Sequence, residues 1–360
     1  MINVTKTFLP SREKFNNYVD EIYKSGWLTN NGSLVQKLAS KLKEYLGVKN
    51  IILVSNGTLA LQVAYRLLDL KGDIITTPFS FVATTSSQVW EGLTPVFADI
   101  DKDSFCIDYK KIEEKITKNT TAIVPVHVFG NACEVEEIEK IASKYNLKLI
   151  YDAAHAFDVK YKNKSILNYG DISILSFHST KLFHTIEGGA LIINDNSLYE
   201  NAKKIINFGI NGPDRVDLLG INCKMNEFQA AMGLCVLEDM DIIKASRQNV
   251  YNYYAQNFKG NNNIVLQKIN ENIKYNYSYF PVVFKSEEIL LKVMKALNSE
   301  QIMPRRYFYP SLDTLCYLKS KQYMPISNDI SKRILCLPMY DSLTKQEVDN
   351  VTDIILETIN

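Results

Sequence analysis

Short apolar runs alternate with segments of helical periodicity through the middle of the chain, and this alternation limits the fold more than any other feature. Apolar runs typical of buried strands lie at residues 50–54, 73–78, 94–98, 122–126, 147–152, 172–176 and 190–193. Between them, at 60–68 and 135–145, apolar residues recur every three or four positions, which predicts helices. This order favours a mostly parallel sheet covered by helices on both faces. Ligands of such sheets bind beyond the carboxyl ends of the strands, so the residues that follow each strand are the candidates for function.

The last part of the chain has a different pattern. Residues 225–258 predict one long helix, and the turn-forming residues at 260–263 follow it. A strand at 279–284 precedes helices at 287–298 and 345–358. We therefore predict a large domain over residues 1–245, with an N-terminal arm, and a smaller α+β domain over residues 246–360.

The net charge, the absence of targeting signals in the sequence and the spacing of the cysteines argue against several classes of protein. The 41 Lys and Arg residues nearly balance 40 Asp and Glu, for a net charge of +1, which argues against a broad surface for nucleic acid or an anionic membrane. The N-terminal segment lacks the apolar stretch of a signal peptide, and no run approaches the roughly 18 apolar residues of a membrane span. The six cysteines form no CxxC pair, which is typical of reduced thiols. We therefore expect a cytoplasmic enzyme with no metal site, no nucleic-acid partner and no membrane partner.

Three groups that could carry chemistry follow predicted strands. Residues 55–58, Ser-Asn-Gly-Thr, stand between a strand and a helix, where free backbone N–H groups can hold a phosphate. These residue types are also ordinary helix caps, and Asp152, after the strand at 147–152, could likewise be only a cap. His155 follows it closely, although a single histidine is more often structural. Lys181 could form a Schiff base if it is partly desolvated, whereas most lysines are solvated surface charges.

The three groups together are a stronger indication of function than any one of them alone. A phosphate cradle, a carboxylate and a lysine, each after a strand of one sheet, match the requirements of pyridoxal phosphate. The phosphate would anchor the cofactor, Asp152 would keep its ring nitrogen protonated, and Lys181 would hold its aldehyde.

The sequence also resembles the DegT-type family of sugar aminotransferases, which are fold-type-I pyridoxal phosphate enzymes. The motifs that carry the resemblance are, in order, SGWLTNNG, SNGTLAL, TTPFSFVAT, YDAAHAF, SFHSTKLFHTIEGGA and GINCKMNEFQAAMG. The resemblance runs over nearly the whole chain, from Gly26 to the segment Arg305–Pro310. The resemblance implies an α/β fold like that of aspartate aminotransferase, in which helices enclose a mostly parallel seven-stranded sheet, with a smaller C-terminal α+β domain.

Catalytic and cofactor roles follow from the resemblance. Lys181 would form the Schiff base and then move the proton between the cofactor and the sugar carbon, and Asp152 would pair with the ring nitrogen. Phe81 would lie against the cofactor ring. The family's contacts to the cofactor phosphate fall on Gly57, Thr58 and Ser176. Asn222 matches a position that, in this family, reaches the phosphate of the partner subunit's cofactor, which implies a homodimer with shared active sites.

Two positions depart from the family pattern. His155 stands where the family usually has Gln, so the contact to the cofactor's ring oxygen would come from an imidazole. Lys224 stands where the family often has Arg, which removes the planar fork needed for a bidentate anion contact.

The substrates are also implied by the resemblance. We expect L-glutamate as amino donor and a nucleotide-linked 4-keto-6-deoxyhexose, with dTDP as the nucleotide, as acceptor. The candidate substrate contacts, which could equally be interface residues, are Trp27, Thr29, Asn30 and Tyr309, with Arg306 for the diphosphate.

Three alternative functions are compatible with this fold. The 3-keto isomer of the sugar is an open alternative acceptor. A sugar dehydratase of the same family would have histidine in place of Lys181, and a non-catalytic regulator would have no need of that lysine.

Overall fold

The computed structural model describes residues 1–359 and is built around a seven-stranded sheet, as predicted. Its strand order is β2-β10-β9-β6-β5-β3-β4, in which β10 is antiparallel to both neighbours and the remaining pairs are parallel. The strands are β2 (Ile51–Val54), β3 (Asp73–Thr76), β4 (Thr94–Phe97), β5 (Thr120–Val124), β6 (Lys148–Asp152), β9 (Ile172–Ser176) and β10 (Gly189–Ile193). The mostly parallel sheet expected from the sequence is therefore confirmed.

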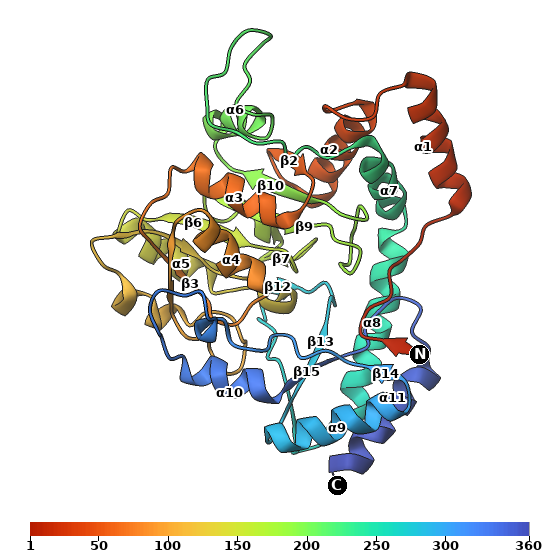
Figure 1. Ribbon diagram of the computed structural model, residues 1–360. Coiled ribbons are helices and arrows are strands. Elements are labelled where there is room, and N and C mark those ends of the chain that lie inside the picture. Colours follow the sequence, from red (N-terminus) through yellow and green to blue (C-terminus); the bar gives the residue numbers. More distant parts are fainter. Residues whose placement is uncertain (360) are drawn as a thin grey trace.

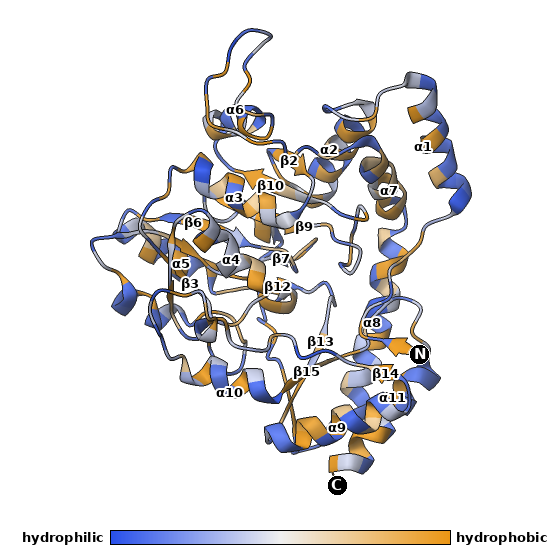
Figure 2. Cartoon of the chain, in the orientation of Figure 1, coloured by the Kyte–Doolittle hydropathy of each residue, from blue (hydrophilic) through white to orange (hydrophobic). Residues whose placement is uncertain are grey.

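Both faces of the sheet are covered, because successive side chains of each strand enter different apolar cores. In β2, Ile51 and Leu53 belong to one core, and Ile52 and Val54 belong to the other, as the period of two requires. Helices enclose these cores, as Figure 1 shows, and the strands are the most apolar part of the molecule in Figure 2. The large-domain helices are α1 (Arg12–Ser25), α2 (Ser33–Leu46), α3 (Gly57–Leu67), α4 (Val82–Trp90), α5 (Val135–Lys144), α6 (Asn196–Ile205) and α7 (Glu227–Glu238).

The C-terminal part has an apolar core of its own. Here β13 (Phe280–Phe284) pairs antiparallel with β11 (Ile264–Leu266) and β15 (Ile334–Leu337). The buried residues of this core come from the sheet and from three helices that pack on it, and these elements gather at the bottom of Figure 1. The helices are α8 (Met240–Asn257), α9 (Glu287–Ser299) and α11 (Lys345–Ile359). The division predicted between residues 245 and 246 falls inside α8, and it stays a prediction.

Short elements tie the two parts together. A small sheet joins β12 (Ile273–Lys274) to β7 (Lys160–Tyr161), which also pairs with β8 (Lys164–Ser165). The N-terminal β1 (Ile2–Asn3) pairs with β14 (Ile302–Met303), and α10 (Pro325–Arg333) precedes β15. The C-terminal part also reaches the edge of the large sheet, where the Gln322 side chain accepts the Phe97 N–H of β4 at 2.8 Å.

The single long helix predicted over 225–258 is wrong. The chain forms α7 and α8 instead, and Asp239 between them has φ −100° and ψ 5°. The Asp239 carboxylate accepts a hydrogen bond from Lys14 of α1 at 3.3 Å, and its carbonyl accepts the Ile243 N–H of α8. The break is therefore a change of backbone conformation at one residue, which apolar spacing does not encode.

The loop at residues 27–32 is held by a buried carboxylate. Glu227 is 1% exposed and accepts hydrogen bonds from the backbone N–H groups of Leu34 and Val35 at 2.9 and 3.0 Å. Its own N–H donates to the carbonyl of Leu28. Glu227 therefore caps α2, where the first N–H groups of the helix lack helical partners, and joins the loop to α7.

We expect Glu227→Gln to lower the free energy of unfolding by about 1–3 kcal/mol, because the amide NH₂ would face a backbone N–H that loses its acceptor. Urea unfolding followed by circular dichroism measures this change. The control Glu300→Gln replaces an exposed carboxylate at the end of α9, and its expected effect is within about 0.5 kcal/mol. Equal effects of the two variants would contradict the capping role.

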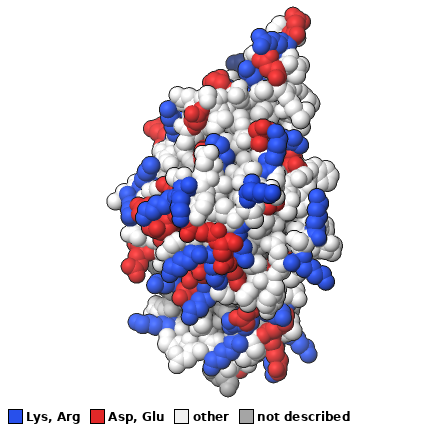
Figure 3. Space-filling view, turned by 90° about the vertical axis from the view of Figure 1, so that its left-hand side faces the viewer, with Lys and Arg blue, Asp and Glu red and all other residues white. Residues whose placement is uncertain are grey.

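Three properties of the described residues concern membrane spans, metal ligands and thiols. Among residues 1–359, no helix is long and apolar enough to cross a membrane, and no cluster of three or more His, Cys, Asp and Glu residues could hold a metal ion. The cysteines are free thiols, and all but Cys316 are buried. The face in Figure 3 carries Lys and Arg interspersed with Asp and Glu, without one large patch of either sign.

Candidate active site

A cavity of about 400 Å³ lies at the carboxyl ends of the central strands. Side chains that follow β2, β6 and β9 line it, together with residues of α4 and of the C-terminal part. The predicted residues that it brings together are Gly57, Thr58, Phe81, Asp152, His155, Ser176 and Lys181. The rule that sites form beyond the carboxyl ends of parallel strands therefore located this cavity correctly.

The loop after β2 leads directly into the N-terminus of α3. The Asn56 side chain caps the helix by accepting the Leu59 N–H at 2.9 Å, so the capping interpretation of this loop is correct. The backbone N–H groups of Gly57 and Thr58, at the first two helical positions, still have no partner within the helix. A Cβ at Gly57 would lie 3.0 Å from the Ser176 Cβ, so glycine lets this N-terminus approach β9 closely. The loop is therefore both a helix cap and a place where an anion can bind.

Asp152 is a buried carboxylate at the end of β6, with 5% of its surface exposed. One oxygen accepts a hydrogen bond from the Thr84 hydroxyl at 2.8 Å, and the other accepts the Ala154 N–H at 3.1 Å. Thr84 is held in turn by Ser80. Burial nevertheless raises the pKa of Asp152, more than these two hydrogen bonds lower it. A cation placed in the cavity would stabilise its charged form.

Lys181 extends into the same cavity, and burial lowers the pKa of its amine to about 8. The Lys181 Nζ donates to the Tyr279 hydroxyl at 3.3 Å and lies over the Tyr279 ring. Since a neutral amine is the nucleophilic form, the environment prepares Lys181 to attack a carbonyl near neutral pH. Lys181 therefore differs from most lysines, which are solvated charges at the surface.

His155 is held as a neutral imidazole. Its Nδ1 accepts the Phe129 N–H at 3.2 Å, so the proton of the neutral ring lies on Nε2. Burial, and to a lesser degree Lys181, lowers the pKa of His155 well below its usual value. The ring is stacked on Phe308 with centroids 5.7 Å apart. His155 is therefore a rigid hydrogen-bond donor in the wall of the cavity.

Several lining residues were not predicted from the sequence. His178 and Glu187 lie at the cavity with His178 Nε2 3.5 Å from a Glu187 oxygen, and both belong to the motif that contains Lys181. Others come from the C-terminal part: Tyr279, and Arg305, Tyr307 and Phe308, which lie in the segment where Arg306 and Tyr309 were predicted as substrate contacts.

The predicted substrate contacts do not line this cavity. Trp27 and Tyr309 are 54% and 49% exposed, Thr29 is also exposed, and Asn30 lines a different cavity. Arg306 lies over the Tyr309 ring at 3.6 Å and is held by the Glu287 carboxylate at 2.7 Å, whereas the neighbouring Arg305 lines the active-site cavity.

Asn222 also lies outside the lining of this cavity. It forms a bridge with Asn207, and the next carbonyl, that of Cys223, accepts the Ser55 N–H at 2.8 Å. Asn222 therefore sits beside the end of β2 and is exposed.

We expect Tyr279→Phe to lower the pKa of Lys181 further, because the variant removes an acceptor that stabilises the protonated amine. In the apoprotein, the pH at which an amine reagent modifies Lys181 should fall, as mass spectrometry can follow, and turnover should drop about tenfold. Tyr323→Phe, at an exposed tyrosine, is the matched control. An unchanged modification profile would show that the Tyr279 hydroxyl does not act on the lysine.

Comparisons with known proteins show the family of the chain. Residues 10–356 match the DegT/DnrJ/EryC1/StrS aminotransferase family. A dTDP-4-amino-4,6-dideoxy-D-glucose transaminase of Shigella dysenteriae is 43% identical over 99% of this chain and 98% of its own length, and one of Escherichia coli is 40% identical over the same shares.

Solved structures share the fold. The structure of DesI in the presence of its TDP-sugar product superposes with a TM-score of 0.95 at 28% identity, covering 100% of this chain and 93% of that one. PseC of Helicobacter pylori, an aminotransferase involved in the biosynthesis of pseudoaminic acid, gives a TM-score of 0.93 at 28% identity over 99% of both chains.

The residues of the cavity fit pyridoxal phosphate. The Asp152 carboxylate, whose pKa is raised by burial, is matched by a protonated ring nitrogen. The Lys181 amine can form a Schiff base with the cofactor's aldehyde, and the N-terminus of α3 can bind its phosphate. The chain is therefore an aminotransferase that uses pyridoxal phosphate, and it belongs to the DegT/DnrJ/EryC1/StrS family.

Proposed function

We propose that the enzyme transfers the amine of L-glutamate to dTDP-4-keto-6-deoxy-D-glucose, giving dTDP-4-amino-4,6-dideoxy-D-glucose and 2-oxoglutarate. The observation that carries the proposal is the identity of 43% and 40%, over nearly the full length, with two transaminases named for this product. The gluco configuration of that product places the new amine equatorially on carbon 4.

The residues of the cavity divide the chemistry between them. Bound pyridoxal phosphate supplies an electron sink for the carbon that loses or gains a proton. The Lys181 amine, whose pKa is about 8, takes the proton from the α-carbon of glutamate and later delivers one to carbon 4 of the sugar. Asp152 would accept a hydrogen bond from the protonated pyridine nitrogen, and His155 would donate one from Nε2 to the ring oxygen.

The nucleotide-sugar is expected to lie where two subunits meet. Trp27, Thr29, Asn30 and Tyr309 are exposed in one chain, and we assign them to the substrate site of a homodimer. Asn222 would reach the cofactor phosphate of the partner subunit. Arg305, at the cavity, is better placed than Arg306 to meet the diphosphate, because Arg306 already contacts Glu287.

A visible absorption spectrum tests the function. The band of the bound cofactor should change with L-glutamate and return when dTDP-4-keto-6-deoxy-D-glucose is added, and NMR of the product should show an equatorial amine on carbon 4. A return only after a 3,4-ketoisomerase is added would assign the reaction to the 3-keto sugar. Absence of any band with added pyridoxal phosphate would contradict the proposed transamination.

A further inference from the structure

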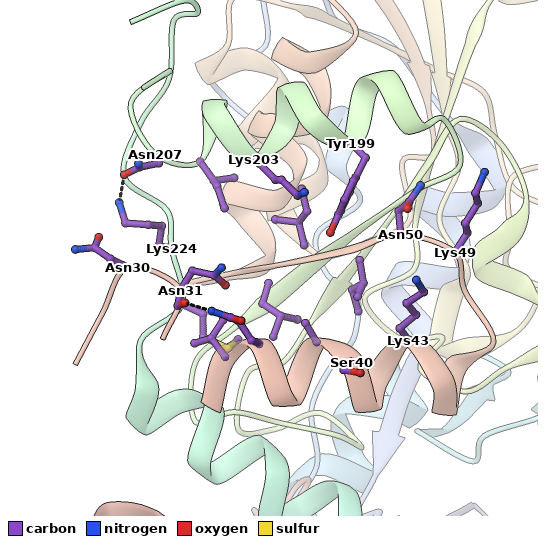
Figure 4. A pocket seen from close by; sticks show the side chains of 18 residues that line it. Asn30, Asn31, Ser40, Lys43, Lys49, Asn50, Tyr199, Lys203, Asn207 and Lys224 are labelled. Atoms are coloured by element: carbon purple, nitrogen blue, oxygen red, sulfur yellow. Dashed lines mark hydrogen bonds between the residues drawn. The ribbon is translucent and has the colours of Figure 1, made fainter. Parts of the chain in front are cut away.

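A second, larger cavity lies on another side of the large sheet. Its volume is about 650 Å³, and it shares no lining residue with the active-site cavity. It opens between α2 and α6, with the edge strand β2 as its floor. We call it the α2–α6 cavity, and Figure 4 shows it from close by.

The charged side chains that line the α2–α6 cavity are all cationic. Lys43 is in the last turn of α2, Lys49 precedes β2, Lys203 belongs to α6, and Lys224 closes one end; no Asp or Glu lines it. Such a concave set of like charges concentrates a positive potential and favours anions.

The nearest carboxylates leave most of this charge uncompensated. Lys203 is 2.8 Å from Glu200, one turn along α6. Within residues 1–359, Lys43, Lys49 and Lys224 have no carboxylate oxygen within 4.0 Å of their ammonium nitrogen. Lys224 donates instead to the Asn207 amide oxygen at 2.7 Å, and burial lowers the pKa of Lys224.

The rest of the lining adds neutral donors and an apolar floor. Figure 4 shows the Lys43 side chain reaching up from α2 and the Tyr199 side chain reaching down from α6 into the same space. Asn30, Asn31 and Asn50 supply amides at the two ends. The floor and walls are apolar, and they include Val35, Ala39, Ile51, Ile52, Leu53 and Ile206.

This combination matches a ligand with a charged end and a flat apolar body. Ammonium and amide groups bind phosphate oxygens, and a tyrosine ring beside aliphatic side chains offers a surface for a base. The volume is within the range of about 300–1,000 Å³ that small-molecule sites have. We propose that the α2–α6 cavity, in the part around Lys43, Lys49 and Lys203, is a second ligand site that binds the diphosphate of a nucleotide. Asn30, at the opposite end of the cavity, belongs to the substrate site of the dimer proposed above.

The test titrates the holoenzyme with dTDP, inorganic pyrophosphate and thymidine by calorimetry. We expect two dTDP molecules per chain, one in each cavity, and measurable pyrophosphate binding that weakens as salt rises. Thymidine, which lacks the charge, should not occupy the second site. Pyrophosphate binding without a second dTDP would mean that the cavity accepts a bare diphosphate only, and the nucleotide part of the proposal would be overturned.

The variant that identifies the cavity is the triple change Lys43→Gln, Lys49→Gln and Lys203→Gln, which shortens each side chain by one atom, keeps a polar end and removes three charges. It should abolish the second dTDP site and weaken pyrophosphate binding by at least roughly tenfold, with the first dTDP site and the cofactor spectrum unchanged. The control triple Lys118→Gln, Lys285→Gln and Lys295→Gln changes three exposed lysines elsewhere, and its binding should equal that of the unaltered enzyme.

Two results would overturn the proposal. One is a single dTDP per chain in both the unaltered enzyme and the cavity variant. The other is a cavity variant that dissociates in sedimentation experiments while its dTDP stoichiometry stays the same, since the lysines would then be contacts to a partner subunit. Pyrophosphate binding is measured without turnover. The test of the second site therefore gives a result even if the proposed transamination is wrong.

Discussion

Replacing Lys181 by alanine should abolish transamination, with a loss of at least about 10⁴-fold in turnover. Lys181 has the amine in the cavity whose pKa is lowered, to about 8, beside a buried carboxylate. The variant loses both the nucleophile for the cofactor's aldehyde and the base that moves the proton. Steady-state release of 2-oxoglutarate from L-glutamate and the keto-sugar measures the loss.

A second variant separates chemistry from folding. Lys181→Arg keeps a cation of similar length, but a guanidinium stays protonated and cannot form the Schiff base. We expect it to be as inactive as Lys181→Ala, with far-UV circular dichroism and thermal unfolding close to those of the unaltered protein. Transamination above about one hundredth of the normal rate in either variant would remove Lys181 from its assigned role.

Asp152→Asn should give the second largest effect, a fall of about 10³-fold or more in turnover, because a neutral amide cannot stabilise a protonated ring nitrogen. The local hydrogen bonds can survive the change. The Asn oxygen can still accept the Ala154 N–H, and the Thr84 hydroxyl, which donates to Asp152, can rotate to accept from the new NH₂. Turnover within tenfold of normal would show that the charge of Asp152 is not required.

The stability of the apoprotein distinguishes a catalytic role of Asp152 from a structural one. Burial raises its pKa in the folded state, so the folded protein binds this proton more tightly than the unfolded chain. Above the folded pKa, the ionised carboxylate therefore opposes folding. Asp152→Asn should not lower the free energy of unfolding at pH 7–8. If Asp152 belonged to a structural ion pair, the same change would lower it. Thr84→Val, which removes the hydrogen bonds to Asp152 and Ser80 and leaves the charge of Asp152, should reduce turnover much less than Asp152→Asn.

Much of the active site was predictable because its residues follow strands whose apolar runs are visible in the sequence. The ends of β2, β6 and β9 place Gly57, Asp152 and Lys181, and the parallel arrangement brings those ends to one edge of the sheet. The family motifs added Phe81 and Ser176, which also line the cavity. These inferences needed only local periodicity and one general rule of sheet topology.

Other features depend on contacts between distant segments. Tyr279, which touches Lys181, and Arg305, which lines the same cavity, come from the C-terminal part. The break between α7 and α8 lies at Asp239, whose carboxylate accepts a hydrogen bond from Lys14, 225 residues away.

The chain's own sequence thus determined the seven strands of the large sheet, the helices α3, α5, α9 and α11, and the chemistry of the groups at the strand ends, since neighbouring residues set hydrophobic periodicity and caps. Only the tertiary structure decided that β10 runs antiparallel to β2 and β9, that Tyr279 meets Lys181, and that lysines of α2 and α6 surround one cavity. Those arrangements arise from packing between segments far apart in the chain, and their energies do not appear in any local pattern.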